Sequence, residues 1–461
     1  MTDRSGKLNL SVSSHTYLYP SEAIPPCLLS KIKGRLTFTN PEYDRNNRLG
    51  KSTWATPEQI CGYDMIGDTL VIPRGFTRQL VGLLRNHNVR FEINDKRRTL
   101  PDVEFSFLGS LKGFQAQAVR TVLSRSFGTL QAPTGSGKTV IALATIAHRT
   151  QPALVLVHTR ELLNQWVDRI QQFLGIPKKE IGIIGGGKRV IGQGVTVGIV
   201  NSIYPITSKI KELFGFLIVD ECHRCPSRMF TEAVSAFDSK FMLGLSATPY
   251  RRDRLTRLIY WNLGDRLHEI EQSTLEATGD VLKAEVITRE TDFVSSWDAS
   301  ERYSQMLSEL TEDRDRNEQI IDDVVKEARK GSGVILIISD RRSHCETLSL
   351  MLSNREINSD TLTGDLSNGT RKDIVERLNA GQVKVLIATG QLIGEGFDCK
   401  SLSTLFLACP IKFSGRLIQY LGRVLRPAPG KNEALVYDYV DSKIGVLENA
   451  ARARQRVYAK A

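Results

Sequence analysis

The sequence contains no apolar run that approaches the roughly 20 residues needed to cross a bilayer. Its N-terminal segment, MTDRSGKLNLSVSS, also lacks the apolar core of a secretion signal. The 7 cysteines are scattered and odd in number, which favours reduced thiols over a disulfide scaffold. Cys222 and Cys225 resemble half of a zinc site, but no second CxxC or histidine pair completes it. These absences predict a soluble cytoplasmic protein with no membrane partner and no zinc.

The charge balance is strongly basic, with a formal net charge of +11 over 461 residues. Such a balance favours polyanionic partners, nucleic acid first, although an incidentally basic enzyme would have the same balance. The hydrophobic content of 41% and the charged content of 25% are ordinary for a globular protein. A chain of this length has room for roughly two to four domains.

The hydrophobic pattern divides the chain into three parts. Residues 109–285 and 286–461 each contain short apolar strands that alternate with helices, which is typical of a parallel sheet covered on both faces. These strands are expected at residues 153–157, 195–200, 216–219, 241–245, 334–338, 383–388, 404–407 and 434–437. We therefore expect an α/β fold of two tandem doubly wound domains, connected near residues 252–289, after a small α+β module at residues 1–108.

The N-terminal module combines basic and aromatic residues. Its strands are expected at residues 8–12, 35–39, 69–72 and 89–93, and a helix at residues 77–86. The basic residues are Lys31, Lys33, Arg35, Arg45, Arg48, Lys51, Arg74, Arg78, Arg90, Lys96, Arg97 and Arg98. Tyr43, Trp54 and Phe76 lie among them, and such a mixture suits phosphate contacts together with base stacking. We expect this module to contact DNA; the alternative is a solvated face around a small core.

A phosphate-loop pattern stands between an expected strand and an expected helix. Its residues are Ala132, Pro133, Thr134, Gly135, Ser136, Gly137, Lys138 and Thr139. The glycines let backbone N–H groups converge on a polyphosphate at a helix N-terminus, Lys138 can reach the β- and γ-phosphates, and the Thr139 hydroxyl can hold Mg²⁺. Ala132 stands where the general pattern has its first glycine. An ordinary glycine turn with an incidental lysine is the alternative.

Two adjacent acids, Asp220 and Glu221, end the strand at residues 216–219. A parallel strand delivers its C-terminal residues to the crevice beside a phosphate loop. Asp220 can there hold hydrated Mg²⁺, while Glu221 can orient and deprotonate an attacking water. Ser246 and Thr248 end the next strand, and their hydroxyls are expected to hydrogen-bond the acidic segment and to sense the γ-phosphate.

Arg423 and Arg426 lie three positions apart, so on a helix they face the same way. Planar guanidinium groups suit a γ-phosphate presented across a cleft, which is the arginine-finger role. We expect ATP to bind between the two α/β domains, with these arginines supplied by the second. A solvated amphipathic helix is the plainer reading of the pair alone.

Together these motifs resemble those of the superfamily-two helicases and translocases, whose fold has two RecA-like domains. The resemblance covers residues 111–440 and implies ATP and Mg²⁺ as cofactors. It implies that Gln115 contacts adenine and that Gln419, Glu395 and Asp398 lie at the nucleotide, with Asp398 linking it to the nucleic acid. It further implies nucleic-acid contacts from Arg160, Asn201, Ser202 and Thr389.

Within that superfamily the sequence resembles the XPB/UvsW branch and its phage-type relatives. The resemblance rests on residues 246–253 and 258–264, on the sequence DECH at residues 220–223 and on Gln419 where the RNA-directed DEAD-box group has His-Arg. It implies a monomeric DNA helicase that remodels branched DNA in replication, recombination or repair, with partners from those processes. Three alternatives remain: a motor subunit that needs a partner nuclease, an ATPase-inactive nucleic-acid-binding protein, and an RNA-tracking enzyme.

Some weaker features remain. Residues 185–189 read Gly-Gly-Gly-Lys-Arg, for which we expect a hairpin near the DNA path or a plain surface turn. His344 and Cys345 are neighbours in sequence, and neighbours on a helix do not face each other, so we expect structural roles for both. The tail at residues 450–456 is expected to be a basic helix end.

Overall fold

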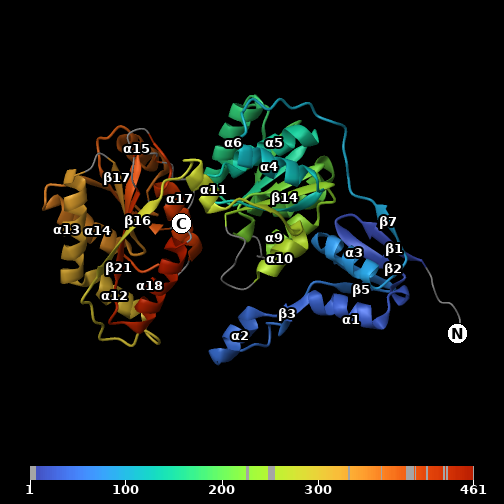
Figure 1. Ribbon diagram of the computed structural model, residues 1–461, viewed down its shortest axis with the longest axis horizontal. Coiled ribbons are helices and arrows are strands. Elements are labelled where there is room, and N and C mark those ends of the chain that lie inside the picture. The colour runs from blue at the N-terminus through green and yellow to red at the C-terminus, as the bar shows by residue number, and fades with distance from the viewer. Residues whose placement is uncertain are drawn as a thin grey trace. The chain divides into compact units, whose positions relative to one another are not determined.

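The computed structural model describes residues 7–224, 228–247, 255–330, 333–364, 366–390, 399, 401–411, 414–428, 431 and 434–459. The chain separates into two compact units (Figure 1). The first comprises Met1–Ala132 and Gly137–Ile270, and the second comprises Pro133–Ser136 and Glu271–Ala461. Within the described residues no helix combines the length and the apolarity needed to cross a membrane.

The larger sheet of the first unit has the order β11-β10-β12-β9-β13-β14-β8-β15. Every neighbouring pair is parallel except β10 and β11. The strands are β8 (Phe127–Gln131), β9 (Ala153–Val157), β10 (Gly182–Gly185), β11 (Lys188–Val190), β12 (Val195–Ile199), β13 (Phe216–Val219), β14 (Phe241–Ser246) and β15 (Arg266–Glu269). The expected parallel α/β architecture is confirmed, and β9 and β13 have the expected bounds.

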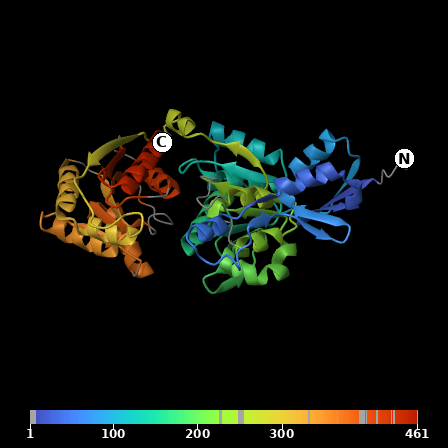
Figure 2. The same ribbon diagram turned by 90° about the horizontal axis from the view of Figure 1, so that it is seen from below.

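Helices cover both faces of this sheet (Figure 2). They are α4 (Gly113–Leu123), α5 (Lys138–Arg149), α6 (Arg160–Leu174), α7 (Val200–Ile203), α8 (Thr207–Ile210), α9 (Arg228–Ser235) and α10 (Thr256–Leu263). Every residue of β9 and β13 is buried as a result. A central strand covered on both faces has no polar side, which explains why its sequence is a continuous apolar run.

The N-terminal module of the first unit has its own sheet in the order β5-β6-β2-β1-β7. Its elements are β1 (Leu8–Val12), β2 (His15–Tyr19), α1 (Pro26–Arg35), β3 (Thr37–Thr39), α2 (Pro41–Arg48), β4 (Gln59–Cys61), β5 (Asp64–Ile66), β6 (Thr69–Pro73), α3 (Thr77–Asn86) and β7 (Phe91–Asp95). Trp261 of α10 is buried in the module's own hydrophobic core. The module therefore shares a packed interior with the larger sheet's helix layer.

The second unit contains a fully parallel sheet in the order β16-β21-β20-β17-β19-β18. Its strands are β16 (Ala284–Glu290), β17 (Val334–Ser339), β18 (Ser359–Leu362), β19 (Val385–Thr389), β20 (Leu402–Leu407) and β21 (Ala434–Val440). Its helices are α11 (Gln272–Ala277), α12 (Tyr303–Glu312), α13 (Arg314–Lys330), α14 (Arg342–Ser353), α15 (Asn368–Asn379), α17 (Ser414–Val424) and α18 (Gly445–Tyr458).

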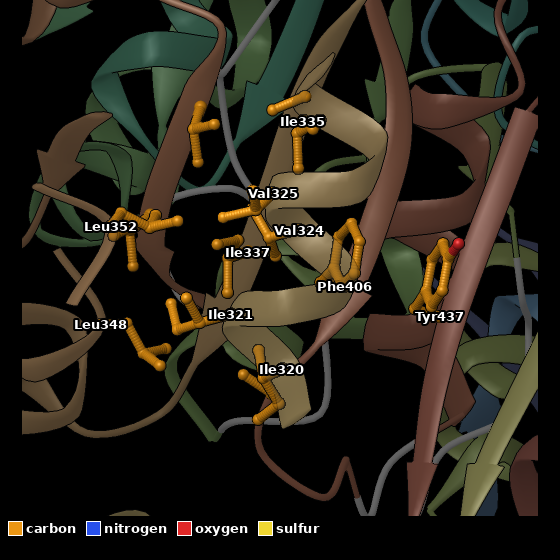
Figure 3. Close-up of a cluster of buried hydrophobic side chains, with 14 of the residues drawn as sticks. Ile320, Ile321, Val324, Val325, Ile335, Ile337, Leu348, Leu352, Phe406 and Tyr437 are labelled. Carbon is orange, nitrogen blue, oxygen red and sulfur yellow. The ribbon is translucent and has the colours of Figure 1, made fainter. Parts of the chain in front are cut away.

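Apolar side chains of α13 and α14 pack on this second sheet (Figure 3). Ile320 and Val324 of α13 are fully buried, as is Ile337 of β17. Phe406 and Tyr437, on neighbouring strands, stack with ring centroids 4.3 Å apart and an interplanar angle of 7°. The spacing of four between Ile320 and Val324 is the helical spacing that places both on one face.

One expectation about local structure was wrong. Helix α1 continues through Arg35, so the strand expected at residues 35–39 is only Thr37–Thr39. The expected connection at residues 252–289 contains the boundary between the two units, which follows Ile270; within that range β15 belongs to the first sheet and β16 to the second. The connecting stretch between these two strands spans residues 270–283 and contains α11.

His344 and Cys345 have structural positions, as expected. Both are buried, and Cys345 belongs to the hydrophobic core of the second unit. The His344 Nε2 atom lies 2.8 Å from Asn317 Oδ1, and its Nδ1 atom lies 3.0 Å from Ser339 Oγ. Burial, followed by the charge of Arg316, lowers the pKa of His344 to about 3. The imidazole is therefore held neutral inside the protein.

This buried histidine predicts a loss of stability at acid pH. The unfolded chain gains a proton on His344 below about pH 6.5, whereas the folded chain gains it only near pH 3. The free energy of unfolding should therefore fall by up to about 1.4 kcal/mol per pH unit between those values. Urea denaturation at pH 4.5 to 7.5 measures this slope, and a His344→Gln variant should show a shallower one. Identical slopes would assign the pH dependence to other groups.

Candidate functional site

The phosphate-loop sequence connects β8 to α5, as the motif predicts. Gly137 stands before the helix with φ 77° and ψ 38°, in the left-handed region that favours glycine. A Cβ built there would lie only 2.5 Å from Gln115 Nε2. Gln115, at the start of α4, therefore lies against the loop, although its contact with adenine stays a prediction.

The main chain around Ala132 explains the departure from glycine at that position. Ala132 is fully buried, and its N–H donates to the Ser246 carbonyl at 2.9 Å. It is absent from the non-glycine residues with positive φ, so an alanine is accommodated without backbone strain. Lys138, the first residue of α5, donates from Nζ to the Ala132 carbonyl at 3.0 Å.

Asp220 follows β13, whose neighbours β9 and β14 are both parallel to it. Its side chain is buried and accepts a hydrogen bond from the Trp166 indole at 2.8 Å. Burial, together with the nearby charge of Glu221, raises the pKa of Asp220 to about 6, while Trp166 and the charge of Lys138 act in the opposite direction. Because β13, β14 and β8 are parallel, Asp220 and Lys138 both follow strand ends at the C-terminal edge of this sheet.

Glu221 adopts φ 48°, a left-handed conformation that is strained for a residue with a side chain. Its Oε2 atom lies 3.2 Å from His223 Nδ1, and the same ring nitrogen lies 3.0 Å from Ser246 Oγ. The expected hydrogen bond between the Ser246 hydroxyl and the acidic segment is thus confirmed, with His223 as the partner. Thr248 lies outside the described residues. The chain from Glu221 through His223 to Ser246 joins the ends of two neighbouring strands.

The residues at this edge fit a nucleotide with Mg²⁺. The loop forms a cradle that a side chain at Gly137 would fill. Asp220 and Thr139 offer carboxylate and hydroxyl oxygens, which are the ligands that Mg²⁺ prefers. The structure thus brings Lys138, Thr139 and Asp220 to the C-terminal edge of one sheet, where ligands of open α/β sheets bind.

A second set of candidate residues occupies the same edge farther along the sheet. Arg160 begins α6 after β9, and Asn201 lies in α7 after β12; both are exposed. Ser202, the next residue of α7, is half-buried. Because β9 and β12 are parallel neighbours, these residues follow strand ends on one side of the sheet. Their contact with nucleic acid stays a prediction.

The glycine-rich segment forms a hairpin beside this set. Strand β10 pairs with β11 in antiparallel register, with Gly185 opposite Lys188. The intervening turn residues, Gly186 and Gly187, have φ values of 59° and 87°. A Cβ on Gly186 would lie 3.3 Å from Arg160 Nε, so Arg160 reaches across β12 to the hairpin tip. Lys188 and Arg189 are exposed on β11, the strand that follows this turn. These two residues and Arg160 are here called the basic edge.

The N-terminal module presents fewer nucleic-acid candidates than its composition predicts. Phe76 is buried in the core, so the base-stacking role considered for it is wrong. Arg74 is only 2% exposed and donates to the carbonyls of Ser13 at 3.2 Å and Ser239 at 2.7 Å. Burial, followed by the charge of Arg97, lowers the pKa of Arg74 to about 9. Arg74 fastens the module to the larger sheet rather than facing a polyanion.

In the second unit, the end of β19 at Thr389 contacts α17, the helix that carries Arg423. Thr389 ends β19 and is half-buried, and Gly390 follows it. The Tyr420 hydroxyl of α17 donates to the Gly390 carbonyl at 2.8 Å. Glu395 and Asp398 lie outside the described residues, as does the side chain of Gln419. The nucleotide contacts expected of these three residues stay predictions.

The two arginines of this unit do not share a helix. Arg423 lies in the last turn of α17, which ends at Val424, whereas Arg426 lies beyond it. The argument that both face one way on a helix is therefore wrong for Arg426. Its carbonyl accepts a hydrogen bond from Lys431 Nζ at 2.8 Å. Their role at a γ-phosphate stays a prediction.

Comparison with known families identifies both α/β domains. Residues 109–251 match the family "Type III restriction enzyme, res subunit", and residues 316–428 match "Helicase conserved C-terminal domain". Together the two matches cover more than half of the chain. The chain belongs to the superfamily-two helicases. Membership implies an ATP-dependent helicase activity on nucleic acid, with ATP as the nucleotide.

Individual relatives fit this membership. The chain is 33% identical to "DNA 3'-5' translocase XPB2" of Sulfurisphaera tokodaii over 173 residues, which are 37% of this chain and 38% of that protein. It is 23% identical to "ATP-dependent DNA helicase uvsW" of Enterobacteria phage T4 over 358 residues, which are 74% of this chain and 70% of that protein. The solved structure of S. cerevisiae Dbp5 bound to RNA and ADP BeF3 matches 77% of this chain and 89% of that chain, with a TM-score of 0.52 at 17% identity. This structural match supports the fold of two tandem RecA-like domains.

Two contacts of this helicase site could not be read from the motifs. The indole of Trp166 fixes Asp220, although Trp166 lies 54 positions earlier in the chain. The hydroxyl of Tyr420 reaches Gly390, 30 positions away. No local pattern marks either residue, because each acts only through a strand end that the fold brings next to it.

Proposed function

We propose that this helicase is an ATP-dependent DNA translocase that remodels branched DNA by fork regression, branch migration or unwinding. The observation that carries the proposal is the arrangement of one sheet edge. Lys138, Asp220 and Glu221 meet at one part of that edge, and Arg160 meets the basic hairpin at another. Two relatives are named as a DNA translocase and a DNA helicase, and two others as putative ATP-dependent RNA helicases. The choice of DNA therefore rests on the sequence DECH at residues 220–223 and on Gln419.

ATP hydrolysis is assigned to the residues of this edge. The loop N–H groups and Lys138 would hold the phosphates, and Thr139 and Asp220 would hold Mg²⁺. When bound, Mg²⁺ supplies positive charge to the phosphate oxygens. Glu221 would orient the attacking water and accept its proton at the carboxylate, held by its contact with His223 at 3.2 Å. Arg423 and Arg426 are proposed to stabilise charge on the transferred phosphate.

The motor is proposed to work through two sets of nucleic-acid contacts. Arg160 and Asn201 belong to the first unit, and Thr389 belongs to the second. A nucleotide-dependent movement between the units would displace one set of contacts relative to the other. Such work is mechanical, so it leaves the covalent structure of the DNA unchanged.

A second candidate function is a motor subunit of a restriction or defence assembly. The observation that favours it is the match of residues 109–251 to the res subunit of type III restriction enzymes. In this role the chain would translocate on DNA while a partner nuclease performs cleavage. Copurification with a nuclease, together with equal stimulation by any duplex, would favour this candidate.

Steady-state ATPase rates distinguish these functions. The rate is measured without nucleic acid and with single-stranded DNA, linear duplex, a fork, a four-way junction or RNA. A Lys138→Ala variant serves as the control for contaminating activity in each condition. Stronger stimulation by the fork or junction than by linear duplex is expected. Stimulation by RNA alone would overturn DNA as the substrate, and turnover no higher than that of the control would indicate an ATPase-inactive binding protein.

The hairpin next to Arg160 provides a specific test of the basic edge. A Lys188→Ala/Arg189→Ala double variant should bind DNA more weakly, because two phosphate contacts are lost. The slope of log K against log salt should become shallower by about two. Fluorescence anisotropy with a labelled duplex at several salt concentrations measures both quantities, and ATPase activity without DNA should stay unchanged.

The matched control is a Lys178→Ala/Lys179→Ala variant. Both lysines are exposed and precede β10, at the opposite end of that strand from the hairpin turn. This variant removes the same charge and should retain the original salt slope. Equal effects in the two variants would show that DNA binding depends on net charge alone and not on the position of the hairpin. An unaffected hairpin variant would assign Lys188 and Arg189 to the protection of an exposed sheet edge.

A further inference from the structure

In one loop of the N-terminal module, hydrogen bonds join the two ends, and the most exposed residues of the loop lie far from these ends. This loop, residues 41–57, is here called the arm; it begins with α2 and leads to β4. The Asn40 N–H donates to the Glu58 carbonyl at 2.8 Å, and Asn40 Nδ2 donates to the Pro57 carbonyl at 2.9 Å. Asn40 Oδ1 also accepts from the Glu42 N–H at 3.0 Å, so one buried side chain ties both ends of the arm together.

The base of the arm is anchored to the RecA-like part of the same unit. Strand β3 pairs with β4, with Phe38 opposite Ile60. The Phe38 ring meets Trp261 of α10 edge to face, with centroids 5.4 Å apart, and the Arg257 guanidinium lies 5.8 Å from the Phe38 centroid. In Figure 1, α2 and β3 extend away from the module's own sheet. The arm is therefore an ordered projection, and its base is fixed by packing against α10.

The far part of the arm combines an exposed indole with positive charge. Trp54 is 96% exposed, whereas Trp166 and Trp261 are buried. Leu49 is 61% exposed in the same segment. Residues 45–56 include Arg45, Arg48 and Lys51, all exposed, and no acidic residue. Backbone hydrogen bonds from Lys51 to Asn46 at 2.9 Å and from Thr56 to Thr53 at 2.9 Å fold this segment into consecutive turns.

We propose that the arm contacts single-stranded nucleic acid, with Trp54 stacked on an unpaired base and Arg48 and Lys51 on flanking phosphates. An aromatic platform among basic residues is how proteins hold single strands without sequence preference. One indole and one leucine are too small for a stable protein interface, which needs about 800 Å² on each partner, whereas a single base needs only the indole face. A duplex offers no such base, because its bases already stack on one another.

This assignment gives the proposed function a strand-selective element. It rests on the proposal that the protein acts on nucleic acid, and it adds the preference for an unpaired segment. Branched DNA exposes single-stranded segments where its duplex branches meet. Since the root of the arm packs on α10, a strand held by Trp54 would be attached to the first RecA-like domain.

The test compares Trp54→Ala, Trp54→Phe and an Arg48→Ala/Lys51→Ala double variant in the full-length chain. Binding of a labelled oligo(dT) is measured without ATP. Trp54→Ala should weaken binding roughly tenfold, because the stacking interaction is lost. The salt slope should stay unchanged, because the substitution removes no ion pair. Trp54→Phe should recover most of that affinity. The double variant should instead make the salt slope shallower by about two.

Intrinsic fluorescence provides an independent readout. Stacking on a base quenches indole emission, so oligo(dT) should quench wild-type protein and a Trp297→Phe control, but not Trp54→Phe. Unchanged affinity of Trp54→Ala and Trp54→Phe, with quenching retained in the latter, would overturn the proposal. If Trp54→Ala alters self-association measured by sedimentation and leaves oligo(dT) affinity intact, the exposed indole is a protein contact and the proposal also fails.

The ATPase assay separates this proposal from the proposed function. Trp54→Ala should retain the wild-type ATPase rate in the absence of nucleic acid, since the arm contains none of the proposed ATPase residues. A chain that binds oligo(dT) through Trp54 but turns over no ATP would refute the motor and retain the arm. A chain with DNA-stimulated ATPase that is indifferent to Trp54 would retain the motor and refute the arm.

Discussion

A Glu221→Gln variant is expected to lose ATP hydrolysis while it still binds ATP. Removal of a general base lowers turnover by about 10²–10⁴-fold. Glutamine has nearly the same shape, so the Glu221 N–H can still donate to Asp220 Oδ1 at 2.9 Å and the backbone can keep its left-handed conformation. Steady-state ATPase assays with saturating DNA measure the loss, and equilibrium titration with a fluorescent nucleotide measures the retained affinity.

Two further variants show whether this loss is specific to the proposed base. Glu180→Gln removes an exposed carboxylate from the same unit and should leave turnover unchanged. Lys138→Ala should lower nucleotide affinity as well as turnover, because it removes a phosphate contact. Unchanged ATP turnover in Glu221→Gln would remove Glu221 from the base role. An equal loss of ATP affinity would show that the substitution disturbs the phosphate loop.

Much of the α/β fold could be predicted because buried parallel strands are continuous apolar runs. Strands β9 and β13 are wholly buried, and their bounds agree with the sequence pattern. Polar edge strands carry no such signal, so β18, with only Leu362 buried, was not expected. Strand β2 lies inside its sheet, but it also lacks an apolar run, because only Thr16 and Leu18 of its five residues are buried. Prediction therefore succeeded for strands covered on both faces and for β1, in which buried apolar residues alternate with polar ones.

The candidate site was predictable to the extent that its residues stand at strand ends. Lys138 and Asp220 follow β8 and β13, so parallel topology alone places them at one edge. What the pattern omits is the side-chain support, such as the Trp166 indole on Asp220. The sequence pattern also places charged residues at the surface by default. This expectation was wrong for Arg74, because two backbone carbonyls accept hydrogen bonds from its guanidinium inside the protein.

The largest expected effect on stability comes from a buried ion pair in the second unit. Arg316 Nε donates to Asp441 Oδ1 at 2.8 Å, and both side chains are 1% exposed. Thr291 Oγ1 donates to the same carboxylate at 2.6 Å, and Arg316 Nη1 donates to the Ala408 carbonyl at 2.7 Å. An Asp441→Ala variant leaves the Arg316 charge buried without its carboxylate. Removal of one partner of a buried pair costs about 3–5 kcal/mol, so urea denaturation followed by circular dichroism should show a loss of that size.

A surface ion pair of the same unit supplies the matched control. Lys443 Nζ lies 2.7 Å from Asp292 Oδ1, but the Asp292 side chain is 97% exposed. Asp292→Ala should leave the unfolding midpoint unchanged, because water replaces the lost partner. An Arg316→Met/Asp441→Leu variant should be more stable than Asp441→Ala, since it buries no lone charge. Its recovery should be incomplete because Thr291 and the Ala408 carbonyl each lose a hydrogen bond. Equal stability of Asp441→Ala and Asp292→Ala would show that water reaches Arg316 and that the pair is not sealed in the core.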